Sequence, residues 1–289
     1  MADRVAVVAD SVACLTREMV EQYGITIAPI PISFQGKIYR DWVDISPSQA
    51  YELFLKDPGS FKTAGASPGI FLDAYRQAGK RAKNIVCITL SAKLSGAYDA
   101  ARKAIEEAKT ELPQLSVEVV DSKTVTASEG FVALAAARAA EAGKSLAEVV
   151  KAAEEIRDRV IFLALLETIR HVYRTGRIPK IAAVAGSMLN IKPILAVSPK
   201  TSGAVHFVGA VRSRERGINK MLGIMRDRMG RSPAHVMVMH AFAPDEAEKL
   251  KERVASEFNC AELWITEFSP VMGYATGTGT LGLAFYKED

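Results

Sequence analysis

Short apolar runs alternate with amphipathic helical patterns along the first half of the 289-residue chain. Runs rich in β-branched residues occupy positions 5–9, 85–90 and 116–120, and each is followed by apolar residues at helical spacing. Strands that alternate with helices of about 10–15 residues favour a parallel sheet covered on both faces. We therefore predict an N-terminal α/β domain with a mostly parallel sheet.

Capping residues mark where several helices of this half begin. Ser46 precedes a helical pattern with Gln49 in capping-box position. Ser67, followed by a proline, and Ser95, followed by a glycine, begin two further helices. The helices predicted in this half span residues 16–23, 47–56, 68–79, 95–109, 128–142 and 145–159.

A segment interrupted by proline follows the first of these helices. Residues 25–34 have an extended pattern that is broken by Pro29 and Pro31. The dipeptide Gln35-Gly36 then provides a turn into residues 37–40, which predicts a hairpin.

The second half combines strands and helices in a less regular order. Residues 191–198 and 204–211 resemble strands joined by a short turn, which predicts a pair of neighbouring strands. No low-complexity linker separates the halves, so we expect two closely packed domains, over 1–160 and 161–289. The second domain is predicted to be mixed α/β, with further strands over 161–165, 235–240, 262–268 and 281–285 and helices over 216–230 and 245–258.

Composition and charge exclude several classes of protein. Apolar residues make up 49% and charged residues 24%, as in soluble globular proteins. No apolar stretch approaches the roughly 20 residues of a membrane span, and no signal peptide is visible, so we expect a cytoplasmic protein without stable membrane insertion. A net charge of +4, spread along the chain, does not indicate nucleic-acid binding. The cysteine and histidine spacings predict neither a metal site nor a bound cofactor.

Two hydroxyl side chains stand where a parallel sheet places its ligand crevice. Thr63 and Ser95 each precede a predicted helix, and Gly96 follows Ser95 directly. Helix N-termini attract anions because their amide protons are unpaired, and ligand crevices lie beyond the carboxyl ends of parallel strands. Plain helix capping is the alternative, because most Ser and Thr residues at helix starts have that role.

Other candidate residues lie in the second half. The segment with Thr276, Gly277 and Gly279 matches no nucleotide-binding motif, but its glycines allow close approach to a ligand or to the other domain. Two basic clusters contain further candidates, with Arg177 beside Arg174 and Lys180 in the first and Arg212 in the second. Each cluster is either an ordinary solvated face, one side of an anion site, or a surface on which a partner docks. The first glycine of a Gly-x-Ser-x-Gly nucleophile elbow is missing before the serine in Leu-Ser-Gly.

Motifs along the whole chain resemble the DegV family of bacterial fatty-acid-binding proteins. They include VADSVACL, YRDWVDISPSQAYELF, KTAGASPGIFLDAY, ITLSAKLSGAYDAA, VVDSKTVTASEGF, LLETIRHVYRTGRI, VRSRERG and GYATGTGTLGLAF. The resemblance implies a fatty acid of the palmitate or oleate class between two domains, with its acyl chain covered by the second. It also implies that Thr63 and Ser95 bind the carboxylate. The Gly96 amide, at the start of the helix after Ser95, is a further candidate donor, because a carboxylate removed from water must be hydrogen-bonded.

The resemblance also implies a partner. Some family members are the binding subunit of a fatty acid kinase, in which a separate ATP-using subunit phosphorylates the bound carboxylate. Arg177 or Arg212 would then stabilise charge or dock that subunit. One departure stands out, because Ala275 occupies the position at which the family usually has a histidine. The adjacent Tyr274 points to the other side if this segment is extended.

Three functions remain open at this point. The first is a fatty-acid carrier that serves a kinase partner and is not itself an enzyme. The second is a lipid-binding module without phosphorylation, which Ala275 favours. The third is an enzyme that acts on a small phosphorylated substrate held by the segment rich in glycine and threonine.

Overall fold

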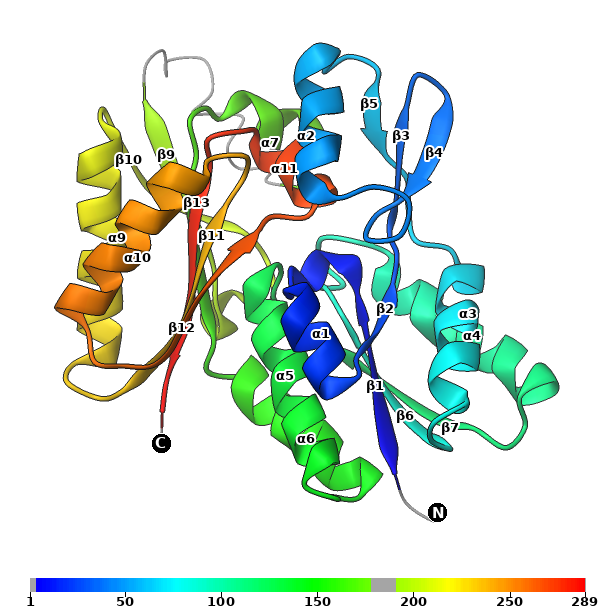
Figure 1. Ribbon diagram of the computed structural model, residues 1–289. Coiled ribbons are helices and arrows are strands. Elements are labelled where there is room, and N and C mark those ends of the chain that lie inside the picture. The colour runs from blue at the N-terminus through cyan, green and yellow to red at the C-terminus, as the bar shows by residue number, and fades with distance from the viewer. Residues whose placement is uncertain (1–3, 178–190, 289) are drawn as a thin grey trace.

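The computed structural model describes residues 4–177 and 191–288, so Lys180 lies outside the described residues. These described residues form three sheets (Figure 1). The first has the strand order β2-β1-β6-β7, and every pair of neighbours in it is parallel. Its strands are β1 (Val5–Asp10), β2 (Thr26–Ala28), β6 (Asn84–Thr89) and β7 (Ser116–Asp121).

Helices cover both faces of this parallel sheet, as the sequence predicts. One face carries α3 (Pro68–Gly79) and α4 (Ala97–Glu111), and the other carries α5 (Ala127–Glu141) and α6 (Leu146–Arg157). A short helix, α1 (Arg17–Tyr23), packs beside α5.

Helix α5 lies between the first sheet and the second. It contacts β1 and β6 on one side and strands of the second sheet on the other. Residues 127–134 are all buried, because a helix that is apolar all round needs protein on every side. This arrangement joins both halves of the chain in one hydrophobic cluster that includes Val8, Phe131, Phe162 and Phe268.

The second sheet is mixed, in agreement with the prediction. Its order is β10-β9-β8-β13-β11-β12, with only β11 and β12 parallel. Helices α9 (Arg214–Met229) and α10 (Pro244–Glu257) cover the face away from α5. The strands are β8 (Ile161–Leu165), β9 (Lys192–Val197), β10 (His206–Val211), β11 (Ala234–His240), β12 (Cys260–Glu267) and β13 (Leu281–Lys287).

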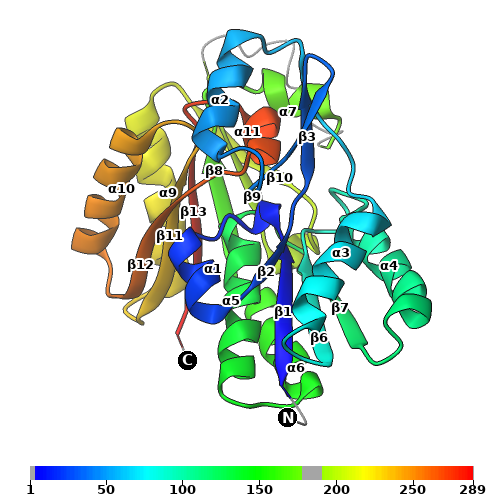
Figure 2. The same ribbon diagram turned by 45° about the vertical axis from the view of Figure 1, so that its right-hand side comes forward.

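The third sheet is small and antiparallel, and the sequence does not predict it as a separate unit. The extended segment over 25–34 divides at its prolines, because β2 joins the first sheet and β3 (Pro31–Phe34) joins the third. Strand β3 pairs with β4 (Lys37–Arg40) and with the three-residue β5 (Phe61–Thr63). Helix α2 (Pro47–Lys56) stands beside this sheet, near α11, above the carboxyl ends of the first sheet (Figure 2).

Two short helices complete the region near the third sheet. Helix α7 (Arg170–Thr175) follows β8, and α11 (Pro270–Thr276) precedes the glycine-rich turn. Ser269 caps α11 by accepting a hydrogen bond from the Met272 amide at 3.4 Å. The segment that holds Tyr274 and Ala275 is therefore helical and not extended, so the two side chains need not point to opposite sides.

Residue 160 divides the chain between the strands of different sheets. Within residues 4–177 and 191–288, the strands before it belong to the first and third sheets, and the strands after it belong to the second. We therefore retain domains over 1–160 and 161–289 as a proposal. Of the helices within the described ranges, none is long and apolar enough to cross a membrane.

Candidate functional site

A cavity of about 410 Å³ lies where the three sheets approach one another. This volume falls in the range of roughly 300–1,000 Å³ that is typical of small-molecule sites. Val12 and Leu90 line it just beyond the carboxyl ends of β1 and β6. The strand order of the sheet reverses between these two strands, and open α/β sheets bind ligands at such a point. The other apolar side chains of the lining include Ile30, Leu94, Val125, Phe162, Ala164, Val172, Leu195, Val205, Val271 and Met272.

The structure brings Thr63 and Ser95 to this same cavity. Thr63 ends β5, and Ser95 lies just before α4, whose N-cap residue is Gly96. The Ser95 hydroxyl oxygen accepts a hydrogen bond from the Ala97 amide at 3.2 Å, so the capping interpretation holds in part. A hydroxyl that accepts one hydrogen bond can still donate its proton. Ser95 can therefore cap α4 and donate to a ligand at the same time.

The charged side chains around the cavity are all basic. Of the described residues that line it, Lys62, Arg174 and Arg177 are basic and none is acidic. Arg177 donates from Nη1 to the Thr175 carbonyl at 2.6 Å and from Nε to the Leu94 carbonyl at 3.5 Å. Arg177 thus links the end of α7 to the loop that holds Ser95. A net positive lining favours an anionic group and opposes a cationic one.

Tyr274 and Ala275 both line the cavity, because consecutive positions of a helix can flank one opening. The Tyr274 ring stacks on Phe61, with ring centroids 6.0 Å apart, and meets the edge of Phe54 at 6.5 Å. Ala275 contributes only a methyl group to the wall. The sequence alone does not assign Lys62 or Tyr274 to the site, because only the convergence of the third sheet with α11 places them there.

The glycine-rich turn is organised by its own hydrogen bonds. The Thr276 hydroxyl donates to the Met272 carbonyl at 2.9 Å, and the Thr280 hydroxyl donates to the Gly277 carbonyl at 2.9 Å. The Gly279 amide donates to the Ala241 carbonyl at 2.7 Å. The turn also follows the C-terminus of α11, where the helix dipole is negative. These features disfavour a phosphate site at the turn.

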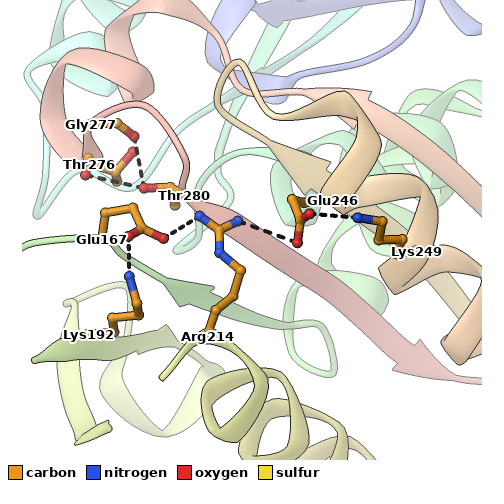
Figure 3. A network of polar contacts seen from close by, with 8 residues as sticks. All are labelled: Glu167, Lys192, Arg214, Glu246, Lys249, Thr276, Gly277 and Thr280. Carbon is orange, nitrogen blue, oxygen red and sulfur yellow. Dashed lines mark hydrogen bonds and ion pairs between the residues drawn. The ribbon is translucent and has the colours of Figure 1, made fainter. Parts of the chain in front are cut away.

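An ion-pair network packs against this turn (Figure 3). Glu167 accepts hydrogen bonds from Lys192 and Arg214, and Arg214 Nη1 lies 4.0 Å from Glu246. A Cβ atom added at Gly279 would come within 2.8 Å of Glu167 Cγ. Gly279 is therefore required for close packing against this network.

Of the remaining candidates, Gly277, Gly279 and Arg212 lie apart from the cavity lining. A Cβ atom at Gly277 would come within 2.5 Å of His171 Cδ2, so Gly277 packs on α7. Thr276 lines the cavity, whereas neither Gly277 nor Gly279 does. Arg212 is exposed and does not line the cavity, and the neighbouring Arg214 belongs to the ion-pair network.

A buried carboxyl group supports the floor of the cavity. Asp10 accepts hydrogen bonds from the amides of Val12 and Leu90, both at 2.9 Å, so it caps the turn after β1 and joins β1 to β6. Burial raises the pKa of Asp10 to about 6. Burial, and next the charge of Asp10, raises the pKa of Glu129. Neither carboxyl oxygen of this buried side chain has a hydrogen-bond partner among the described residues. The signal for Glu129 in the sequence is an acid in the first turn of a helix whose other residues are mostly apolar.

Replacing Asp10 by asparagine is expected to change how stability depends on pH. Because folding raises the pKa of Asp10 from 3.8 to about 6, its contribution to stability is fully present below about pH 4 and falls as pH rises through about 6. The loss is on the order of 3 kcal/mol. An asparagine side chain cannot titrate, and its amide nitrogen cannot accept from a backbone donor. In urea unfolding, the free energy of unfolding of wild type should be well above that of Asp10→Asn at pH 4, and this difference should be smaller at pH 8. A difference that does not vary with pH would contradict this role.

Known proteins resemble this chain over nearly its whole length. The family model described as "Uncharacterised protein, DegV family" matches residues 4–288. A DegV domain-containing protein of Streptomyces coelicolor is 35% identical, and the alignment covers 98% of each chain. A fatty-acid-binding DegV family protein from Thermus thermophilus superposes with a TM-score of 0.88 at 28% identity, covering 99% of this chain and 100% of the other. DegV of Bacillus subtilis, a fatty acid binding protein, gives a TM-score of 0.88 at 27% identity, with the same coverage. The match over nearly the whole chain shows that this protein belongs to the DegV family.

Proposed function

We propose that this protein is a cytoplasmic carrier that binds a long-chain fatty acid of the palmitate or oleate class. The observation that carries the proposal is the lining of the central cavity. Its walls are apolar, two hydroxyl groups lie on it, and its charged side chains among the described residues are basic. The fatty acids bound by the relatives from Thermus thermophilus and Bacillus subtilis support the same ligand class.

Both the acyl chain and the carboxylate of the ligand would contribute to the binding energy. Each methylene that leaves water contributes about 0.8 kcal/mol, so a long acyl chain supplies most of the affinity. A carboxylate removed from water must be hydrogen-bonded, or its burial is costly. Thr63 and Ser95, which line the cavity, are proposed donors, and the basic lining residues complement the charge. The Gly96 amide is proposed as a further donor because it follows Ser95 directly at the start of α4, although Gly96 itself does not line the cavity.

We further propose that the chain presents the carboxylate to a separate ATP-dependent fatty acid kinase. The partner would transfer the γ-phosphoryl group of ATP to a carboxylate oxygen, giving acyl phosphate and ADP. Arg177 lies at the cavity and is exposed, which suits charge stabilisation. Arg212 is exposed outside the cavity, which suits docking. Thr276, Gly277 and Gly279 would then shape the region around the ligand through the packing of α11.

A lipid-binding module without phosphorylation is the second candidate. Ala275 favours it, because its methyl group gives the cavity wall no proton donor or acceptor at this position. An enzyme acting on a small phosphorylated substrate is disfavoured, because the Thr276 and Thr280 hydroxyls and the Gly279 amide already donate hydrogen bonds to main-chain carbonyls.

Two assays separate these functions. Lipid-free protein should bind a fluorescent fatty acid that palmitate and oleate displace, and glycerol 3-phosphate should not compete. Palmitate-loaded protein is then incubated with ATP and a fatty acid kinase subunit, and acyl phosphate is trapped with hydroxylamine. Formation of the hydroxamate supports the carrier for a kinase, whereas binding without hydroxamate favours the lipid-binding module. Competition by glycerol 3-phosphate alone would refute both.

A further inference from the structure

One arginine at the cavity is held on an aromatic ring. The Cζ atom of Arg174 lies 4.9 Å from the centroid of the Tyr274 ring, within the range of a cation–π contact. Arg174 comes from α7 and Tyr274 from α11, and both side chains line the cavity. The ring itself is fixed, because it stacks on Phe61 and meets the edge of Phe54. The guanidinium therefore rests on a rigid platform.

The platform lies beside the proposed head-group site. Tyr274 stacks on Phe61, and Phe61 and Thr63 belong to the same strand, β5. Residues two apart in a strand point to the same face. The side chain of Thr63 is therefore adjacent to Phe61 on the face that Tyr274 covers. Arg174 and the Thr63 hydroxyl thus approach the cavity from the same end.

Arg174 also differs from the other two cations of the lining. Arg177 donates two hydrogen bonds to main-chain carbonyls, at Thr175 and Leu94. Lys62 has no aromatic platform among the described residues, and its flexible chain must be ordered before it can bind. Across residues 4–177 and 191–288, the Arg174 guanidinium has no ion pair or hydrogen bond with a protein acceptor. Its planar donors are positioned and available.

We infer that Arg174, held on Tyr274, supplies the positive charge that binds the ligand carboxylate. This inference rests on the proposed function and deepens it. Thr63 and Ser95 provide neutral donors, and Arg174 makes the site selective for an ionised head group over an uncharged one. The small Ala275 side chain beside Tyr274 leaves the ligand access to this end of the cavity.

The test compares two ligands that share an acyl length and differ in charge. Palmitate and hexadecanol are titrated against wild type, Arg174→Gln, Tyr274→Leu and Lys62→Gln, with Arg228→Gln as an exposed control on α9. Arg174→Gln should weaken palmitate binding about tenfold and leave hexadecanol binding unchanged, because a hydrogen bond to a charged group is lost. Tyr274→Leu should reduce the preference for palmitate by a smaller factor. Added NaCl should weaken palmitate binding in wild type more than in Arg174→Gln.

The outcomes distinguish this inference from the function on which it rests. Unchanged palmitate affinity in Arg174→Gln, with normal binding by wild type, would overturn the role of Arg174 alone. If Lys62→Gln instead of Arg174→Gln loses the preference for palmitate over hexadecanol, the role of Arg174 would also be overturned. Equal weakening of both ligands in Arg174→Gln would mark a structural role and contradict the inference. Failure of wild type to bind either ligand would overturn the proposed function together with the inference.

Discussion

Replacing Gly130 by alanine is expected to lower the free energy of unfolding by about 2–3 kcal/mol, because the new methyl group would overlap atoms that already pack against this position. A Cβ atom at Gly130 would lie 2.6 Å from the Ala13 carbonyl oxygen and 3.1 Å from Leu15 Cδ2. The nearer atom belongs to the backbone, so no rotation of a side chain relieves the clash. Helix α5 would have to move away from the turn after β1, which supports the cavity floor.

The matched control is the same substitution in another helix. Gly223 lies in α9, and a Cβ atom there would meet nothing within 4 Å. Gly223→Ala should therefore raise the free energy of unfolding by about 0.5–1 kcal/mol through helix propensity alone. Urea unfolding of both variants at one pH measures the contrast. Equal effects of the two substitutions would show that α5 does not pack against the turn as described.

Ala164→Phe is expected to abolish most fatty-acid binding without loss of stability. Ala164 lies on β8, lines the cavity and is buried, so the larger ring would occupy space that the acyl chain needs. Displacing about four methylenes costs about 3 kcal/mol, or roughly a hundredfold in affinity. Competition against a fluorescent fatty acid measures the affinity, and thermal unfolding measures the stability.

Ala284→Phe tests whether this space is a cavity or ordinary core. Ala284 lies on the neighbouring strand β13, pairs with Phe162 and is fully buried, but it does not line the cavity. The added ring should overpack the core and lower stability by about 1–3 kcal/mol. If Ala164→Phe destabilises the protein as much as Ala284→Phe, the cavity cannot accommodate an acyl chain.

The sequence predicts the parallel sheet, the mixed sheet and most helix starts, because these depend on local patterns. Ser46 illustrates this, since its capping box forms as the spacing of Gln49 indicates. Strand β5 is not predictable in this way, because three residues carry no periodic signal and only pairing with β3 defines it. Helix α11 is also short, and Gly273 within it weakens the helical pattern that its Ser269 cap supports.

The candidate site is also only partly predictable from local sequence patterns. Thr63 and Ser95 are predicted from the sequence because each precedes a predicted helix, and both line the cavity in the structure. Tyr274 and Arg174 meet at the cavity only through the packing of α11 against α7, so their contact is a property of the tertiary structure. The apolar wall is equally hidden, because a leucine that lines a cavity has the same local pattern as a leucine in a packed core.

Mass spectrometry of organic extracts from purified wild-type protein and Ser95→Ala tests the central claim most directly. Ser67→Ala is the matched control, because Ser67 also stands at a helix start but makes no capping bond and does not line the cavity. We expect one equivalent of a long-chain fatty acid in wild type and Ser67→Ala. Ser95→Ala should be depleted, since losing a hydrogen bond to a buried carboxylate costs about 1–3 kcal/mol. An empty wild-type extract from protein that also fails to take up palmitate or oleate would contradict the account.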